Sequence, residues 1–295
     1  MVLLNFICAV VTRSLFILVS LIGVWTWVKN NKLYWFLTIL YLPLVAEMII
    51  TLRSRRSRVY KWFSPTIFLF LVSIIPTVWI LEVDHLQNKP PAEKCAKLDS
   101  AESIGKFIVG FRNGTNGTDF SQMHSLCARD WILALHQILL ILLIVGKWLL
   151  PTGGEVTRDE LAQILLVFVG TAADILEFNS ETLYDIKGES PELLYATLAV
   201  WTWSMLQFPF HLSVVSSDPE NFEENLLARH RPDICQIVEA LFIQDGPFLV
   251  VRLSVMSHFK VVHQMLLFFT IKNLLVVSLN LYRLHIIISE LKSNH

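Results

Sequence analysis

Charged residues inside long apolar stretches are the part of this sequence that could do chemistry. Asp245 lies near the middle of such a stretch, directly before Gly246-Pro247, and Arg252 follows seven residues later. A charge at the centre of a membrane costs at least about 2.5–3.5 kcal/mol, so it faces protein or water and finds a partner. Pro247 lacks a backbone N–H and predicts a helix break, which membranes tolerate where a helix lines a cavity.

The height of each charge along its span predicts its partner, because an α-helix rises about 1.5 Å per residue. Three ion pairs between spans are predicted in this way: Asp245 with Lys272, Arg252 with Asp174 or Glu177, and Glu47 with Arg13. Such pairs either only fix the order and register of helices, or they line a path for an ion, a proton or a lipid headgroup. The structural role is favoured for Glu47 and Arg13, and both roles stay open for the acids around Asp245.

No catalytic motif is recognisable. The sequence contains no HExxH, no GxSxG, no phosphate-binding loop and no cysteine-rich metal site. Asp174 and Asp245 could share a proton as in an intramembrane aspartyl protease, but the glycine-rich context of such enzymes is missing. We therefore predict no catalytic residue, no metal and no cofactor. Four histidines lack ligand-like spacing on one helix, and we predict hydrogen-bonded structural roles for them: His136, His211, His258 and His263.

Membrane-spanning helices must position these charges. Of the 295 residues, 54% are hydrophobic and 17% are charged, compared with about 45–50% and 25% in soluble domains. The net charge of −1 says nothing about nucleic acid, but no domain-wide basic face is present, so no nucleic-acid partner is expected; the lipid bilayer is an expected partner. Apolar runs of about 17–25 residues predict a single all-α domain, a polytopic membrane helical bundle. Its eight expected spans are 3–28, 33–52, 65–81, 131–150, 161–178, 193–215, 234–256 and 261–284.

One long polar loop, 82–130, separates the third span from the fourth. It carries two glycosylation sequons, at Asn113 and Asn116, and two cysteines, Cys95 and Cys127. Glycosylation and disulfide formation both occur on the lumenal or extracellular side. We predict glycans on this loop and a disulfide between its cysteines, with free thiols or intermolecular bridges as the alternative.

The orientation follows from charge. Five basic residues within 53–61 favour the cytosol, and this segment is one span away from the glycosylated loop, so the two signals agree. Lys29 and Lys32 fall on the lumenal side and oppose this orientation, but the basic segment outweighs them. We expect both termini in the cytosol and the protein in the endoplasmic reticulum or plasma membrane.

Several stretches resemble the transmembrane protein 26 family, and together they cover most of the chain outside the polar loop. The resemblance implies a multi-pass membrane protein, and it implies no activity, catalytic residue or ligand. The matching stretches are 61–65 (KWFSP) through Trp79, 147–151 (KWLLP), 168–178 (FVGTAADILEF), 201–209 (WTWSMLQFP), 242–253 and 259–283.

Three functions are compatible with these features. A membrane protein with a charged interior that moves an ion, a proton or a lipid headgroup is the leading hypothesis. A regulatory or scaffold membrane protein, whose polar residues only hold helices together, is the alternative. An intramembrane enzyme is least favoured, because the motif search is negative. A protein partner or a homo-oligomer is left open.

Overall fold

The computed structural model describes residues 2–28, 32–54, 63–87, 128–150, 158–183, 191–210, 226–258 and 262–293. Nearly all of these residues are helical, which confirms the predicted all-α class, and an isolated bridge joins Phe63 to Phe210. Two of the helical segments are π-helices, η3 and η5, and η1 is a 3-10 helix. The element order is α1 (Val2–Val28), η1 (Lys32–Tyr41), α2 (Leu42–Ser54), α3 (Pro65–Gln87), α5 (Ala128–Leu149), α6 (Arg158–Glu177), η3 (Phe178–Leu183), α8 (Pro191–Met205), α9 (Leu226–Glu239), η5 (Ala240–Gln244), α10 (Asp245–His258) and α11 (Gln264–Ser293).

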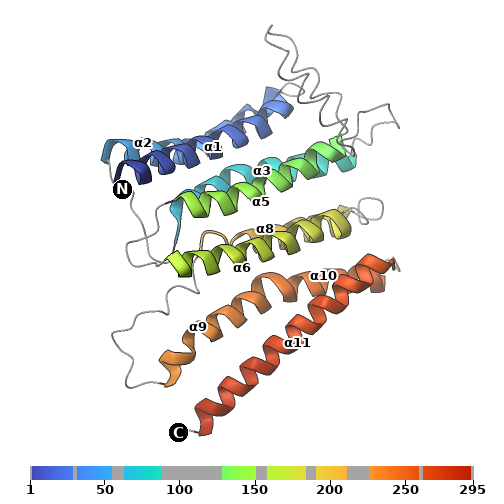
Figure 1. Cartoon of the computed structure of the whole chain (residues 1–295). Coiled ribbons are helices and arrows are strands. Elements are labelled where there is room, and N and C mark those ends of the chain that lie inside the picture. Colours follow the sequence, from blue (N-terminus) through green and yellow to red (C-terminus); the bar gives the residue numbers. More distant parts are fainter. Residues whose placement is uncertain are drawn as a thin grey trace, which may run out of the picture.

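The helices pack as a bundle of roughly aligned rods (Figure 1). At one side α1 contacts α2, α3 and α5, and α5 in turn contacts α6. At the other side α11 lies along α9 and α10, and α8 connects the two parts because it contacts both α3 and α10. The two chain termini lie at the same end of the helices, as an even number of passes requires (Figure 1).

Among the described residues, six helices are long and apolar enough to cross a membrane. They correspond to six of the eight expected spans: Phe6–Val24, Pro65–Asp84, Trp131–Leu149, Leu161–Ser180, Asp233–Ser257 and Gln264–Ser293. The expected span 33–52 instead divides into η1 and α2. The apolar part of these two helices together, Leu37–Thr51, is shorter than the six helices above.

The expected span 193–215 corresponds to α8, which ends at Met205. A turn follows, and the backbone N–H of Ser64 donates a hydrogen bond to the carbonyl of Pro209 at 2.8 Å. The rings of Phe63 and Phe210 also meet, with centroids 5.5 Å apart. The end of α8 is therefore tied to the start of α3, and Pro209 has no N–H with which to continue the helix.

The polar loop is shorter than the sequence predicts. Helix α3 continues to Gln87 and α5 begins at Ala128, so the ends of the expected loop 82–130 are helical. Glu82 is 1% exposed and lies inside the bundle. The predicted glycosylation sites and disulfide, at Asn113, Asn116, Cys95 and Cys127, lie outside the described residues. Cys8 and Cys235 are free thiols.

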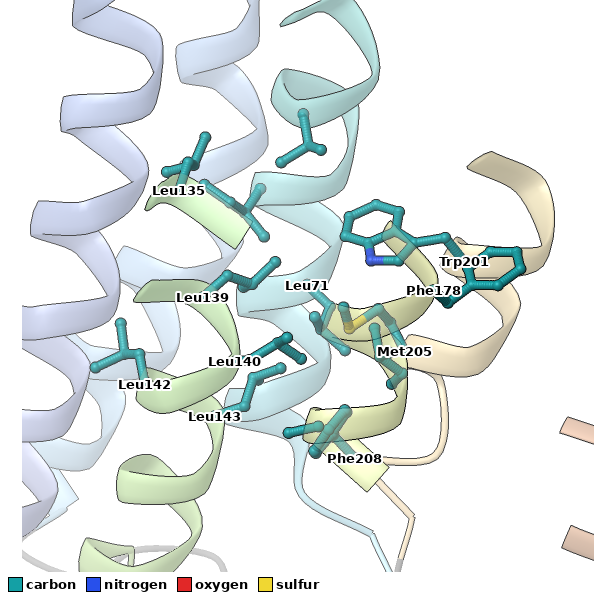
Figure 2. Packing of buried hydrophobic residues seen from close by; sticks show 14 of the residues in the cluster. Leu71, Leu135, Leu139, Leu140, Leu142, Leu143, Phe178, Trp201, Met205 and Phe208 are labelled. Carbon is teal, nitrogen blue, oxygen red and sulfur yellow. The ribbon is translucent and has the colours of Figure 1, made fainter. Parts of the chain in front are cut away.

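The core is built from aliphatic and aromatic side chains of several helices (Figure 2). Leucines of α5, such as Leu139 and Leu143, face Leu71 of α3, and Trp201 and Met205 of α8 approach from the other side. Elsewhere in this core the ring of Phe16 stacks on Phe70 at 4.3 Å between centroids. This packing holds the helices at fixed relative heights, and those heights decide which charges meet.

Candidate functional site in the membrane interior

The helical pass that carries Asp245 contains a π-helical turn. The backbone N–H of Asp245 donates to the carbonyl of Ala240, five residues back, at the end of η5. Helix α10 then continues through Gly246-Pro247 without interruption, so the predicted helix break is wrong. The extra residue of a π-turn displaces the carbonyls that precede the proline, and this accommodates a residue without an N–H.

Lys272 of α11 forms an ion pair with Asp174 of α6. Gln244 of η5 donates a second hydrogen bond to the Asp174 carboxylate, from Nε2 to Oδ2 at 3.2 Å. The predicted pair of Asp245 with Lys272 is therefore wrong.

Lys272 pairs with Asp174 and not with Asp245 because of the height of Asp174 along its helix. The helix of α6 continues through η3, so Asp174 lies nine residues before its end at Leu183 instead of four before the predicted end at 178. Lys272 lies eight residues after the start of α11, at nearly the same height. Asp245 lies thirteen residues before the end of α10, which places it deeper than Lys272 by about 7 Å.

Arg252 and Glu177 are brought together, as their heights along the helices predict. The guanidinium Nη2 donates to Glu177 Oε1 at 2.6 Å, and Nη1 donates to the backbone carbonyl of Phe269 at 3.3 Å. The guanidinium also lies 5.6 Å from the ring centroid of Phe178 and 5.5 Å from that of Phe269. Arg252 is 1% exposed, so this cation is held by one carboxylate and two aromatic rings.

Asp245 is buried beside these pairs. Among the described residues it makes no ion pair or side-chain hydrogen bond, although it lies close enough to Asp174, Lys272 and Arg252 to interact with them electrostatically. The charges that gather here, which we call the central cluster, are three acids and two bases: Asp174, Glu177, Asp245, Lys272 and Arg252. With every group ionised, the central cluster carries one surplus negative charge.

Arg13 and Glu47 meet at a separate place, between α1 and α2. Arg13 donates from Nε and Nη2 to the two carboxylate oxygens of Glu47 at 2.7 and 2.6 Å. Thr66 of α3 also donates to Glu47 Oε1 at 3.1 Å, and the Arg13 Nη1 donates to the carbonyl of Ala9. This bidentate pair ties three helices together and leaves neither charge without a partner.

The family model of transmembrane protein 26 matches residues 3–283. The chain belongs to the transmembrane protein 26 family. It is an integral membrane protein with several apolar helices. The matched region contains the whole central cluster and the Arg13–Glu47 pair. No solved structure matches the chain.

Two buried polar features of this transmembrane protein 26 family member escaped sequence reasoning. Lys147, 2% exposed, lies over the ring of Phe168. A contact between Glu82 and His136 was missed because Glu82 was assigned to the polar loop. Val83 and Leu86 continue the apolar pattern past residue 81 and indicate that the helix extends beyond Glu82. Within the described ranges, no group of three or more His, Cys, Asp or Glu side chains could hold a metal ion.

Proposed function

We propose that the protein binds a proton or a small monovalent cation at the central cluster and carries it across the membrane. The surplus acid of that cluster is the observation that supports this function. An uncompensated charge is costly among apolar helices, so a cluster of three acids and two bases favours uptake of one further positive charge. Arg252 pairs with Glu177 and Lys272 with Asp174, so Asp245 is the acid without an ion-pair partner among the described residues.

The exposure of the cluster is graded. The side chains of Asp174 and Lys272 are 30% and 32% exposed, whereas Asp245 and Arg252 are more than nine-tenths buried. A cation that arrives at Asp174 competes there with the Lys272 ammonium, and the released ammonium has Asp245 as its nearest surplus acid. This exchange of partners provides two arrangements of the same charges, which alternating access requires. A lipid headgroup fits less well, because its bulk would have to reach groups that are almost fully buried.

The π-turn η5 supports the same proposal. Gln244 of η5 donates a hydrogen bond to Asp174, and Asp245 follows Gln244 directly. A change in the conformation of this turn therefore moves both Asp245 and the side chain that binds Asp174. π-Helical turns inside α-helices occur frequently at functional sites, because one extra residue re-aims the side chains around it.

A regulatory or scaffold function is the second candidate, and the Arg13–Glu47 pair favours it. That pair is fully hydrogen-bonded and joins α1, α2 and α3, as expected for a group that only specifies helix order. We propose no catalytic role. Asp174 is occupied by Lys272 and Gln244, so it does not share a proton with Asp245 in the manner of an aspartyl protease.

The orientation expected from the sequence remains part of the proposal. We infer that both termini face the cytosol and that the 88–127 segment is lumenal or extracellular, glycosylated and disulfide-bonded. The basic segment 53–61 and the paired sequons support this orientation. Residence in the secretory pathway, in the endoplasmic reticulum or the plasma membrane, follows from it.

Flux measurements in proteoliposomes test the transport proposal. Purified protein is reconstituted, and uptake of H⁺, Na⁺ and K⁺ is followed with ion-sensitive dyes under an imposed gradient. We expect flux of one of these ions, and Asp245→Asn is expected to slow it at least about tenfold because the surplus acid is gone.

Asp233→Asn is the matched control, since Asp233 lies on the same helical pass and forms only a half-exposed contact of 3.6 Å with Arg283. Its flux is expected to equal that of the unmodified protein. If the unmodified protein moves none of the three ions, or if Asp245→Asn is as active as the control, the scaffold function takes precedence.

A further inference from the structure

A second polar cluster lies apart from the central cluster, where α3, α5 and η3 meet. His136 is at its centre, with Nε2 3.3 Å from Glu82 Oε1 and Nδ1 3.0 Å from Asn179 Nδ2. The three residues are 1%, 1% and 5% exposed. The indole of Trp201 meets the imidazole ring edge-on at 4.9 Å between centroids. An imidazole is thus held between a carboxylate and an amide, away from solvent.

This arrangement defines the protonation of the ring. When Asn179 donates from Nδ2 to Nδ1, the imidazole is neutral and its proton is on Nε2, from which it is donated to Glu82. In this state the Asn179 Oδ1 atom is buried and has no hydrogen-bond partner among the described residues. A buried polar atom without a partner costs about 1–3 kcal/mol, so its presence calls for an explanation.

A half-turn of the Asn179 amide gives Oδ1 a hydrogen-bond partner when the ring is protonated. Rotation about χ2 exchanges Nδ2 and Oδ1, and Oδ1 then accepts a hydrogen bond from a protonated Nδ1. The lone pair of Nδ1 takes up one proton, no other bond is formed or broken, and the ring becomes an imidazolium hydrogen-bonded on both sides. With Glu82 ionised, the imidazolium lies directly against a carboxylate of opposite charge, which favours the charged ring in apolar surroundings.

We propose that Glu82, His136 and Asn179 form a buried proton-binding site, in which the amide of Asn179 turns to match the protonation of His136. Asn179 serves as the donor to the neutral ring and as the acceptor for the protonated ring. The contacts of the imidazole are the charged Glu82 from α3, the neutral Asn179 from η3 and the neutral Trp201 from α8. The site shares no residue with the central cluster, so it stands whether or not the protein transports an ion.

Histidine NMR tests the site directly. The protein, labelled with ¹⁵N-histidine and reconstituted in lipid nanodiscs, is titrated between about pH 5 and pH 9, and the His136 signal is identified by its loss in His136→Gln. We expect both ring nitrogens of His136 to shift through one titration, from the pattern of an imidazolium to that of a neutral ring protonated on Nε2. The unmodified protein is sufficient for this measurement. A His136 signal that stays constant over the whole range overturns the proposal.

Two substitutions of Asn179 separate a proton site from mere packing. Asn179→Asp is an acceptor only, so it favours the imidazolium and moves the midpoint to higher pH. Asn179→Leu has a similar volume and no acceptor, so it moves the midpoint to lower pH. Each shift is expected to reach about one pH unit, a tenfold change in proton affinity.

His230 serves as the internal control in every spectrum. It also lies 3.3 Å from a carboxylate, that of Glu290, but this glutamate side chain is 54% exposed and the contact is remote from Asn179. Its midpoint is expected to stay constant among the variants. Shifts of His136 in the same direction for Asn179→Asp and Asn179→Leu show that the amide has no donor–acceptor role, and the proposal then fails.

Discussion

The Cα of Gly246 lies so close to the carbonyl oxygen of Leu241 that a Cβ built on this glycine would be 2.1 Å from that oxygen. The contact joins residues five apart, the spacing of the π-turn that precedes α10. No side chain, not even a methyl group, fits there unless the turn unwinds. The glycine therefore permits the π-turn, and the π-turn aims Asp245 and Gln244 into the bundle.

Gly246→Ala is expected to destabilise the protein by about 1–3 kcal/mol, the range for a methyl group forced into a filled site. The measurement is the midpoint of unfolding in detergent, followed by tryptophan fluorescence. Gly170→Ala is the matched control, because a Cβ on Gly170 meets no atom within 4 Å. Alanine is also the better helix former, so the control variant should be as stable as the unmodified protein or more so. Equal stability of the two variants would show that the π-turn does not depend on Gly246.

The Arg13–Glu47 pair is expected to behave as a buried ion pair. Arg13→Met leaves the Glu47 carboxylate without its cation, which typically costs about 3–5 kcal/mol. The double variant Arg13→Met/Glu47→Leu removes both charges and is expected to be much closer to the unmodified protein. Denaturant titration of Arg13→Met, Glu47→Leu and the double variant gives the coupling energy between the two side chains. Additive losses would mean that the two side chains stabilise the bundle independently, contrary to the contact at 2.6 Å.

The charge balance of the central cluster predicts that the stability lost by removing one of its bases is regained by removing one of its acids. Lys272→Gln leaves three acids with one base, and the melting temperature is expected to fall by about 3 °C or more. Adding Asp245→Asn to this variant restores the original surplus of one negative charge, so the double variant should regain most of the lost stability. Thermal unfolding in detergent measures both effects. A double variant less stable than Lys272→Gln would indicate that Asp245 stabilises the fold by a contact of its own.

The predicted orientation can be tested on the intact protein expressed in mammalian cells. Treatment with an N-glycosidase is expected to increase its gel mobility, and Asn113→Gln/Asn116→Gln should remove the effect. Reduction is expected to lower the mobility of the deglycosylated protein, and Cys95→Ser should abolish that change because Cys127 then lacks its partner. A protein that carries no glycan, with both sequons intact, would place the 88–127 segment on the cytosolic side and invert the topology.

How much of the site the sequence could predict depends on how each partner is positioned. Counting residues along straight helices was enough to place Arg13 near Glu47 and Arg252 near Glu177. The same count failed for Lys272, because η3 lengthens the helix of α6 and moves Asp174 to a new height. Glu82 was missed for a different reason: it was placed in the polar loop, although Val83 and Leu86 continue the apolar pattern of the helix beyond it.

The sequence by itself determined that the chain crosses a membrane repeatedly and that its charges must turn inward, because hydrocarbon does not solvate ions or unpaired backbone groups. That requirement acts on each segment separately and can be recognised from composition alone. Only the tertiary structure decided which charges meet. The heights themselves depend on where each helix ends and on its π-turns, and the π-turn η3 brings Asp174 to the height of Lys272 while Asp245 lies deeper. Asp174 rather than Asp245 therefore holds Lys272, and His136 lies between Glu82 and Asn179.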